Sequence, residues 1–161
     1  MSQIKLTPGG IATLASMLEV SAPKPGNVHR GADFEDVTFV DFATSAVVLG
    51  EVLEANADQP LGKTILKAVE QNIKSVGTNT NLGIVLLIAP LAKIAGAQSS
   101  QNLTVESVSS YLSELDGNDG SSVFDAIRLA KPEICITHTP GRMLITDLPS
   151  AFDSRLEDAG L

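Results

Sequence analysis

The sequence predicts an all-α fold, a helical bundle around one central apolar helix. Apolar residues recur at helical spacing in several segments, and no segment shows the convincing alternation of period two that is typical of strands. Apolar residues make up 43% of the 161 residues but aromatic residues only 4%, so the core must be built from Ala, Val, Leu and Ile. Such side chains favour close packing between helices, and the length is sufficient for a real hydrophobic core.

The first helix is predicted to begin at Thr7 and Pro8, because proline is tolerated in the first helical turn. We expect it to run to about Val20, with apolar residues at helical spacing at Ile11, Leu14, Ala15 and Leu18. Pro23 and Pro25 then bias the residues before them away from helix, which predicts a long connection to about Val37. Connections of this length in compact domains are usually functional or disordered.

Capping signals place the second and third helices. Thr38 with Asp41 three residues later resembles a capping box, with Asp in place of Glu, and predicts a helix to about Ala55. A third helix is predicted from about Pro60, and Gly77 is placed to end it in a left-handed conformation. The apolar residues of this helix share one face, namely Leu61, Ile65, Ala68, Val69, Ile73 and Val76.

The fourth helix, about Leu82 to Ala95, is apolar on nearly every side, which predicts the central position in the bundle. Pro90 is expected to kink it. The apolar run from Leu82 to Ala92 has 11 residues. A helix that crosses a bilayer needs roughly 20, so we interpret this run as a buried helix.

Later segments carry weaker signals. A fifth helix is predicted over Thr104 to Leu115, with inward-facing side chains at Val105, Val108, Leu112 and Leu115. After the turn DGNDGSS, Ser122 and Asp125 predict a capped start for a short sixth helix through Ala130. Residues 133–161 show no sustained period of either kind, so we expect a tail of uncertain fold.

Charge and cysteine content limit the partners. The formal net charge of −8 argues against nucleic acid or an anionic membrane as a partner. An anionic substrate would need a local basic cluster or a metal ion to offset this charge. The single cysteine, Cys135, cannot form an internal disulfide, and the N-terminus lacks an apolar signal core. We therefore expect a cytoplasmic protein.

The segment 22–30, APKPGNVHR, gathers binding groups between the first two helices. Its two permanent cations, Lys24 and Arg30, can offset phosphate charge, Arg through a bidentate fork. His29 is a potential acid, base or ligand, and Asn27 can both donate and accept hydrogen bonds.

Gly26 lets the backbone of the same segment turn or approach a ligand closely. Just downstream lie the carboxylates of Asp33, Glu35 and Asp36. These are oxygen ligands of the kind that Mg²⁺ uses while it also holds substrate phosphates. The alternative interpretation of the region is a proline-rich turn with ordinary surface charges.

A second polar segment, GTNTNLG at 77–83, lies between the third helix and the start of the fourth. At a helix N-terminus it can form an anion cradle from hydroxyls, amides and backbone N–H groups, with the candidate residues Gly77, Thr78, Asn79, Thr80, Asn81 and Gly83. The alternative is a C-cap followed by an N-cap. Ser45, within the second helix, is expected to bond its own backbone rather than act as a nucleophile.

Taken together, these motifs resemble the triphosphoribosyl-dephospho-CoA synthase family. That family has a PKPG-x-V loop after its first helix, then a downstream acidic D-F element, an F-x-x-S helix, a G-x-N-T-x-x-G loop opening an apolar helix, and A-I-R-L-A. The chain matches this order in LEVSAPKPGNVHRGADFEDVTFVDFATSA, GTNTNLGIVLLIAPLA and FDAIRLAKP, from about Met17 to Pro132. It is therefore identified as a divergent member, apparently shortened at the C-terminus. It has Asn81-Leu82 where known members commonly have histidine and lysine.

The resemblance implies a transferase that moves a triphosphoribosyl group from ATP to the 2′-hydroxyl of 3′-dephospho-CoA, or to a related acceptor, and releases adenine. The product is a precursor of the prosthetic group of acyl carrier subunits. Magnesium would be required by the triphosphate, the partners would be small-molecule nucleotides, and a homo-oligomer is left open. The domain would be residues 1–132, with 133–161 as an atypical tail.

The resemblance also suggests roles. Lys24 and Arg30 would contact phosphates, Asp33 and Asp36 would hold magnesium or face the developing positive charge, and the catalytic set would be Asp33, Asp36 and His29. Two alternatives remain, a non-catalytic nucleotide- or phosphate-binding remnant of the family and a purely structural helical protein. The catalytic interpretation predicts that Asn27 and Asn79 face one shared cleft.

Overall fold

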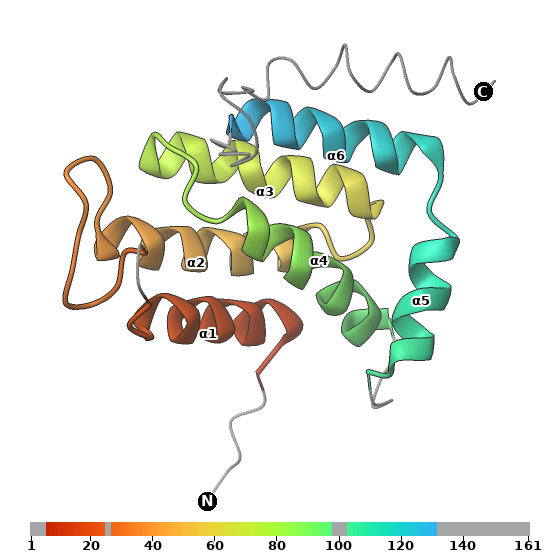
Figure 1. The fold of residues 1–161 in the computed structure, drawn as a ribbon. Coiled ribbons are helices and arrows are strands. Elements are labelled where there is room, and N and C mark those ends of the chain that lie inside the picture. Colours follow the sequence, from red (N-terminus) through yellow and green to blue (C-terminus); the bar gives the residue numbers. More distant parts are fainter. Residues whose placement is uncertain (1–5, 25–26, 98–102, 132–161) are drawn as a thin grey trace, which may run out of the picture. The chain divides into compact units, whose positions relative to one another are not determined.

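The computed structural model describes residues 6–24, 27–97 and 103–131. Within these ranges the chain forms six helices and no strand, which confirms the all-α prediction (Figure 1). The chain divides into two compact units, Met1–Ala130 and Lys131–Leu161, and all six helices belong to the first. The helices are α1 (Pro8–Ser21), α2 (Phe39–Ala55), α3 (Leu61–Val76), α4 (Leu82–Ala97), α5 (Val105–Ser113) and α6 (Gly117–Ala130).

Three helix ends follow the local signals in the sequence. The Thr7 hydroxyl accepts a hydrogen bond from the Gly10 amide and begins α1. At the start of α2 both halves of the capping box form, because the Thr38 amide donates to Asp41 Oδ2 at 2.8 Å and the Asp41 amide donates to Thr38 Oγ1. Gly77 ends α3 with φ of 88°, a left-handed conformation that glycine adopts without a steric penalty. These three predictions are confirmed.

The prediction of the sixth helix was wrong at its start. Helix α6 begins at Gly117, inside the segment predicted as a turn, rather than at Ser122. The cause is Asp116, whose Oδ1 accepts from the amides of Asn118 and Asp119 at 2.8 and 3.0 Å. This carboxylate satisfies the first amides of the helix, so the helix can begin in spite of its glycine.

The fifth helix was also misjudged in part. Helix α5 ends at Ser113, and two of its predicted inward side chains, Val105 and Leu112, are 81% and 45% exposed. Val108 and Leu115 are partly buried, as expected. Helix α5 is short and packs mainly against α4. Only a narrow row of its side chains is therefore in contact with another helix, and the other apolar side chains stay exposed.

Helix α4 contacts α1, α2, α3 and α5, in agreement with a central position. Val85 and Ala89 are fully buried, although Leu87 on the opposite side is 67% exposed. Pro90 lies inside the helix and is buried, and the predicted kink stays a prediction. The core that holds these helices together consists of Ala12, Leu49, Val52, Leu53, Leu61, Ile65, Ala68, Val69, Leu82, Val85, Ala89, Ala126 and Ala130.

Helix α1 packs on α2 through small residues and turns an apolar face away from it. Its buried residues are Gly9, Ala12, Ser16 and Val20. Ile11, Leu14 and Leu18 are instead 53%, 49% and 64% exposed. Among the described helices, none is long and apolar enough to cross a membrane.

Candidate functional site

The basic segment after α1 is held by a buried anchor and a tight turn. Val28 is only 3% exposed. His29 and Ala32 exchange both backbone hydrogen bonds, at 3.0 and 2.9 Å, so the chain reverses between them. The His29 Nδ1 accepts from the Gly31 amide at 3.2 Å, which places the proton of the neutral ring on Nε2.

The cations of this segment differ in their surroundings. The Lys24 ammonium forms an ion pair with the Glu19 carboxylate at the end of α1. Arg30 and Asn27 are both exposed. The backbone amide of Asn27 donates to the Lys24 carbonyl. Gly26 lies outside the described residues. This surface therefore offers one paired and one exposed cation to an anion.

The acidic element lies between that turn and α2. The Asp33 Oδ1 accepts from the Phe39 amide at 2.6 Å, so this carboxylate already helps to cap α2. Asp36 is exposed and lies within a turn in which the Phe34 amide donates to the Val37 carbonyl at 3.0 Å. In the described part of the chain, no three His, Cys, Asp or Glu side chains are grouped for metal binding. The metal role of Asp33 and Asp36 stays a prediction.

The second polar segment builds the N-terminus of α4. The Asn79 Oδ1 accepts from the Leu82 amide at 3.1 Å, and the Val85 amide donates to the Asn81 carbonyl at 2.9 Å. Within the described structure, the amides of Gly83 and Ile84 donate to no atom of the preceding loop. Gly83 is exposed, and a Cβ added there would meet no atom within 4 Å. Asn79 thus acts as a cap and leaves two helix-terminal donors available.

Beneath this loop lies a buried polar network that the sequence analysis did not anticipate. Ser45 and Asn72 are 0% and 2% exposed. Thr80 Oγ1 lies 2.5 Å from Ser45 Oγ and accepts from Asn72 Nδ2 at 3.1 Å. Asn81, 6% exposed, donates from Nδ2 to the Ser45 carbonyl at 3.4 Å, and its Oδ1 has no hydrogen-bond partner.

Sequence reasoning identified only part of this network. The bond from the Ser45 hydroxyl to its own backbone was predicted and is confirmed, with the Asp41 carbonyl as acceptor at 2.8 Å. Asn72 was missed, although an amide beside the apolar face of α3 is the kind of signal that could have pointed to it. Its Nδ2 lies 3.4 Å from the Thr78 carbonyl as well as 3.1 Å from Thr80 Oγ1.

Both polar segments lie at the same end of the bundle (Figure 1). Helix α2 runs away from the basic segment, and the short connection 56–60 returns the chain into α3. The start of α2 and the end of α3 therefore lie together, and the contact between Ser45 and Thr80 joins the two regions directly. The shared cleft between Asn27 and Asn79 stays a prediction.

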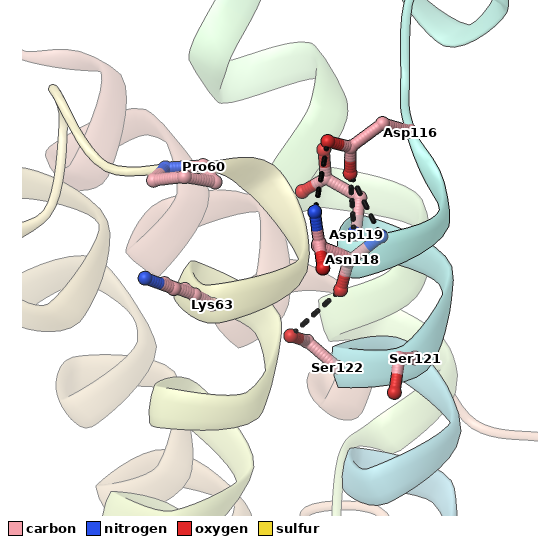
Figure 2. Close-up of a pocket in the computed structure, with 7 residues that line it drawn as sticks. All are labelled: Pro60, Lys63, Asp116, Asn118, Asp119, Ser121 and Ser122. Atoms are coloured by element: carbon pink, nitrogen blue, oxygen red, sulfur yellow. Dashed lines mark hydrogen bonds between the residues drawn. The ribbon is translucent and has the colours of Figure 1, made fainter.

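A cavity of about 380 Å³ lies at the opposite end of α3 (Figure 2). The 16 residues of α3 separate it from Gly77 by roughly 24 Å at 1.5 Å per residue. Its carboxylates are engaged as helix caps, since Asp119 Oδ1 accepts from the Gly62 amide at 2.6 Å and Asp116 caps α6. We interpret this cavity as a gap where the starts of α3 and α6 meet, rather than as a binding site. It is lined by Pro60, Lys63, Asp116, Asn118, Asp119, Ser121 and Ser122.

Comparison with known proteins identifies the family. The family model described as ATP:dephospho-CoA triphosphoribosyl transferase matches residues 5–154, beyond Pro132 where the motif resemblance ended. Searches of curated proteins and of solved structures gave no significant match. The family match supports triphosphoribosyl transfer from ATP to dephospho-CoA, and nothing found favours the non-catalytic alternative. The chain belongs to the ATP:dephospho-CoA triphosphoribosyl transferase family.

Proposed function

We propose that the end of the bundle where α2 and α4 begin is the site at which this chain binds ATP and transfers its triphosphoribosyl group to dephospho-CoA. The observation that carries the proposal is the open N-terminus of α4, with free amides at Gly83 and Ile84. The loop that leads into it contacts α2 at Ser45, and the segment with the exposed cation Arg30 precedes α2 in the chain. A helix N-terminus with unpaired amides favours anions, because the donors and the helix dipole act in the same direction.

The triphosphate is the part of the substrate that this end can recognise. The Gly83 and Ile84 amides supply neutral donors, and Lys24 and Arg30 supply positive charge. Lys24 must exchange Glu19 for a phosphate oxygen, so its contribution depends on competition with that carboxylate. Local cations are necessary because the chain as a whole carries a charge of −8.

In the reaction, the bond from the ribose anomeric carbon to the adenine nitrogen breaks, and its electron pair leaves with adenine. The ribose ring then carries positive charge, which a nearby carboxylate can stabilise. Asp33 and Asp36 are the carboxylates of this region. The acceptor hydroxyl forms the new bond to the anomeric carbon and gives up its proton to solvent. His29, whose Nδ1 accepts from the Gly31 amide and so leaves Nε2 to carry the proton of a neutral ring, would donate that proton to the departing adenine.

Magnesium fits the donor set of this region. Mg²⁺ is commonly held by one or two carboxylates together with waters and substrate phosphates. Asp33 and Asp36 are exposed and three residues apart, and only one Asp33 oxygen is engaged, by the Phe39 amide. The ion would neutralise phosphate charge. These two residues would hold it.

The direct test is release of free adenine from ATP in the presence of magnesium and dephospho-CoA, measured by chromatography. We expect Lys24→Ala to raise the KM for ATP about tenfold, the loss of one charge-assisted contact. Lys67→Ala is the matched control, because Lys67 is also a lysine paired with a carboxylate, that of Glu70 at 3.6 Å. Unchanged ATP binding and turnover in Lys24→Ala would refute the role of Lys24. Thermal stabilisation by ATP without adenine release would instead support a non-catalytic protein.

A further inference from the structure

The shorter contacts of the buried network beneath the second polar loop select one arrangement of hydrogens, in which the 3.4 Å contact between Thr80 Oγ1 and Asn72 Oδ1 is not used as a hydrogen bond. A hydroxyl has one proton to donate. The Ser45 hydroxyl donates to the Asp41 carbonyl at 2.8 Å, so Ser45 Oγ can only accept from Thr80. Thr80 Oγ1 therefore donates to Ser45 and accepts from Asn72 Nδ2 at 3.1 Å. The chain of donors runs from Asn72 on α3, through Thr80, to Ser45 on α2.

This arrangement uses the one proton of the Thr80 hydroxyl and one of its two lone pairs. Both neighbours are almost fully buried, at 0% for Ser45 and 2% for Asn72, so a broken bond there leaves a polar atom without water. Asn72 lies within hydrogen-bond reach of the Thr78 carbonyl at 3.4 Å as well, and Asn81 reaches the Ser45 carbonyl. Residues on both sides of Asn79 are thus tied to α2 and α3.

We propose that Ser45 and Asn72 are positioning residues of the proposed nucleotide site, acting through Thr80. They fix the loop that carries Asn79 and leads into the free amides of Gly83 and Ile84. The inference rests on the proposed function for the identity of the ligand. The positioning itself is a property of the loop and can be measured without a ligand. Preorganised donors bind an anion more tightly than donors that must first be ordered.

The experiment compares Ser45→Ala with Ser16→Ala. Ser16 is also a buried helical serine, 3% exposed, and its hydroxyl bonds the Ala12 carbonyl four residues earlier at 2.9 Å. The two substitutions remove the same group from similar surroundings, but only Ser45 contacts the loop. We expect Ser45→Ala and Thr80→Val to raise the KM for ATP about three- to tenfold, the size of one ordinary hydrogen bond. Thr80→Ser retains the hydroxyl and should therefore have a KM for ATP close to that of the wild type.

A second measurement separates the two proposals. Hydrogen exchange of the amides from Asn79 to Val85, in the absence of nucleotide, should be faster in Ser45→Ala than in wild type and unchanged in Ser16→Ala. Equal exchange and equal KM in the two serine variants would overturn the positioning role. Wild-type protein that neither releases adenine nor gains stability with ATP would overturn the proposed function, while faster exchange would still show that Ser45 orders the loop.

Discussion

At the scale of single residues, the start of α2 shows how a local hydrogen bond affects titration. The Thr38 hydroxyl and amide both donate to Asp41 Oδ2 at 2.8 Å. These bonds hold the pKa of the Asp41 carboxyl below its ordinary value of 3.8. Because the folded pKa is the lower one, Asp41 contributes stability that is present above the unfolded value and lost as the pH falls through the folded pKa.

We expect Asp41→Asn to be less stable than wild type near neutral pH, since the amide cannot accept these bonds as a charged group. The difference between the two unfolding free energies should narrow as the pH falls below 3.8. Chemical denaturation at a series of pH values measures this directly. A difference that stays constant across the acidic range would contradict the capping role of the Asp41 charge.

Lys93 presents a second prediction at this scale. It is only 9% exposed, and its ammonium donates to the carbonyls of Asn56, Ala57 and Gln59 in the connection between α2 and α3. Burial lowers the pKa of Lys93, although the charges of two nearby aspartates oppose this. Lys93→Met should destabilise the fold by about 2–4 kcal/mol, because three carbonyls of the connection lose the charged group that donates to them. Lys67→Met, at an exposed position, should change the denaturation midpoint little.

At the scale of helices, α1 and α2 approach closely at two glycines. A Cβ at Gly50 would lie 2.0 Å from Thr13 Oγ1 and 2.8 Å from the Gly9 carbonyl oxygen. Gly50→Ala should therefore force the helices apart and destabilise the protein by about 1–3 kcal/mol. Gly120→Ala in α6 is the control, since a Cβ there meets no atom within 4 Å. The control should stabilise by about 0.5–1 kcal/mol through helix propensity. A thermal unfolding midpoint of Gly50→Ala equal to that of the wild type would show that α1 and α2 do not pack tightly at Gly50.

The sequence predicts the helix ends that are marked by local signals. It does not predict which residues contact one another across different helices. Thr38 and Gly77 mark helix ends through bonds and angles within a few residues. Val105 was placed inward because spacing defines a stripe but not the neighbour that covers it. In the same way, the polar loops were visible in the sequence, whereas the contact between Ser45 and Thr80 joins residues 35 positions apart. Nothing in either local sequence specifies that pairing.

At the scale of the helical unit, we expect the apolar side chains buried between α2, α3 and α4 to contribute more to the free energy of unfolding than those on the outer face of α1. Leu49 is 1% exposed, whereas Leu18 is 64% exposed. Leu49→Ala should destabilise by about 2–5 kcal/mol, through lost burial and the cavity that remains. Leu18→Ala should cost about 0.5 kcal/mol or less, as is usual for surface positions. Comparable losses in urea denaturation would show that the outer face of α1 is covered in solution.

The long separation between Ser45 and Thr80 also bears on how the chain matures during synthesis. A ribosome must deliver α2, α3 and the first turn of α4 before the contact between Ser45 and Thr80 can form, so this contact cannot order the loop in a shorter nascent chain. A nucleotide that needs this loop binds only the completed fold, and mass action then adds its binding energy to the native state. ATP would in this way act as a folding ligand as well as a reactant.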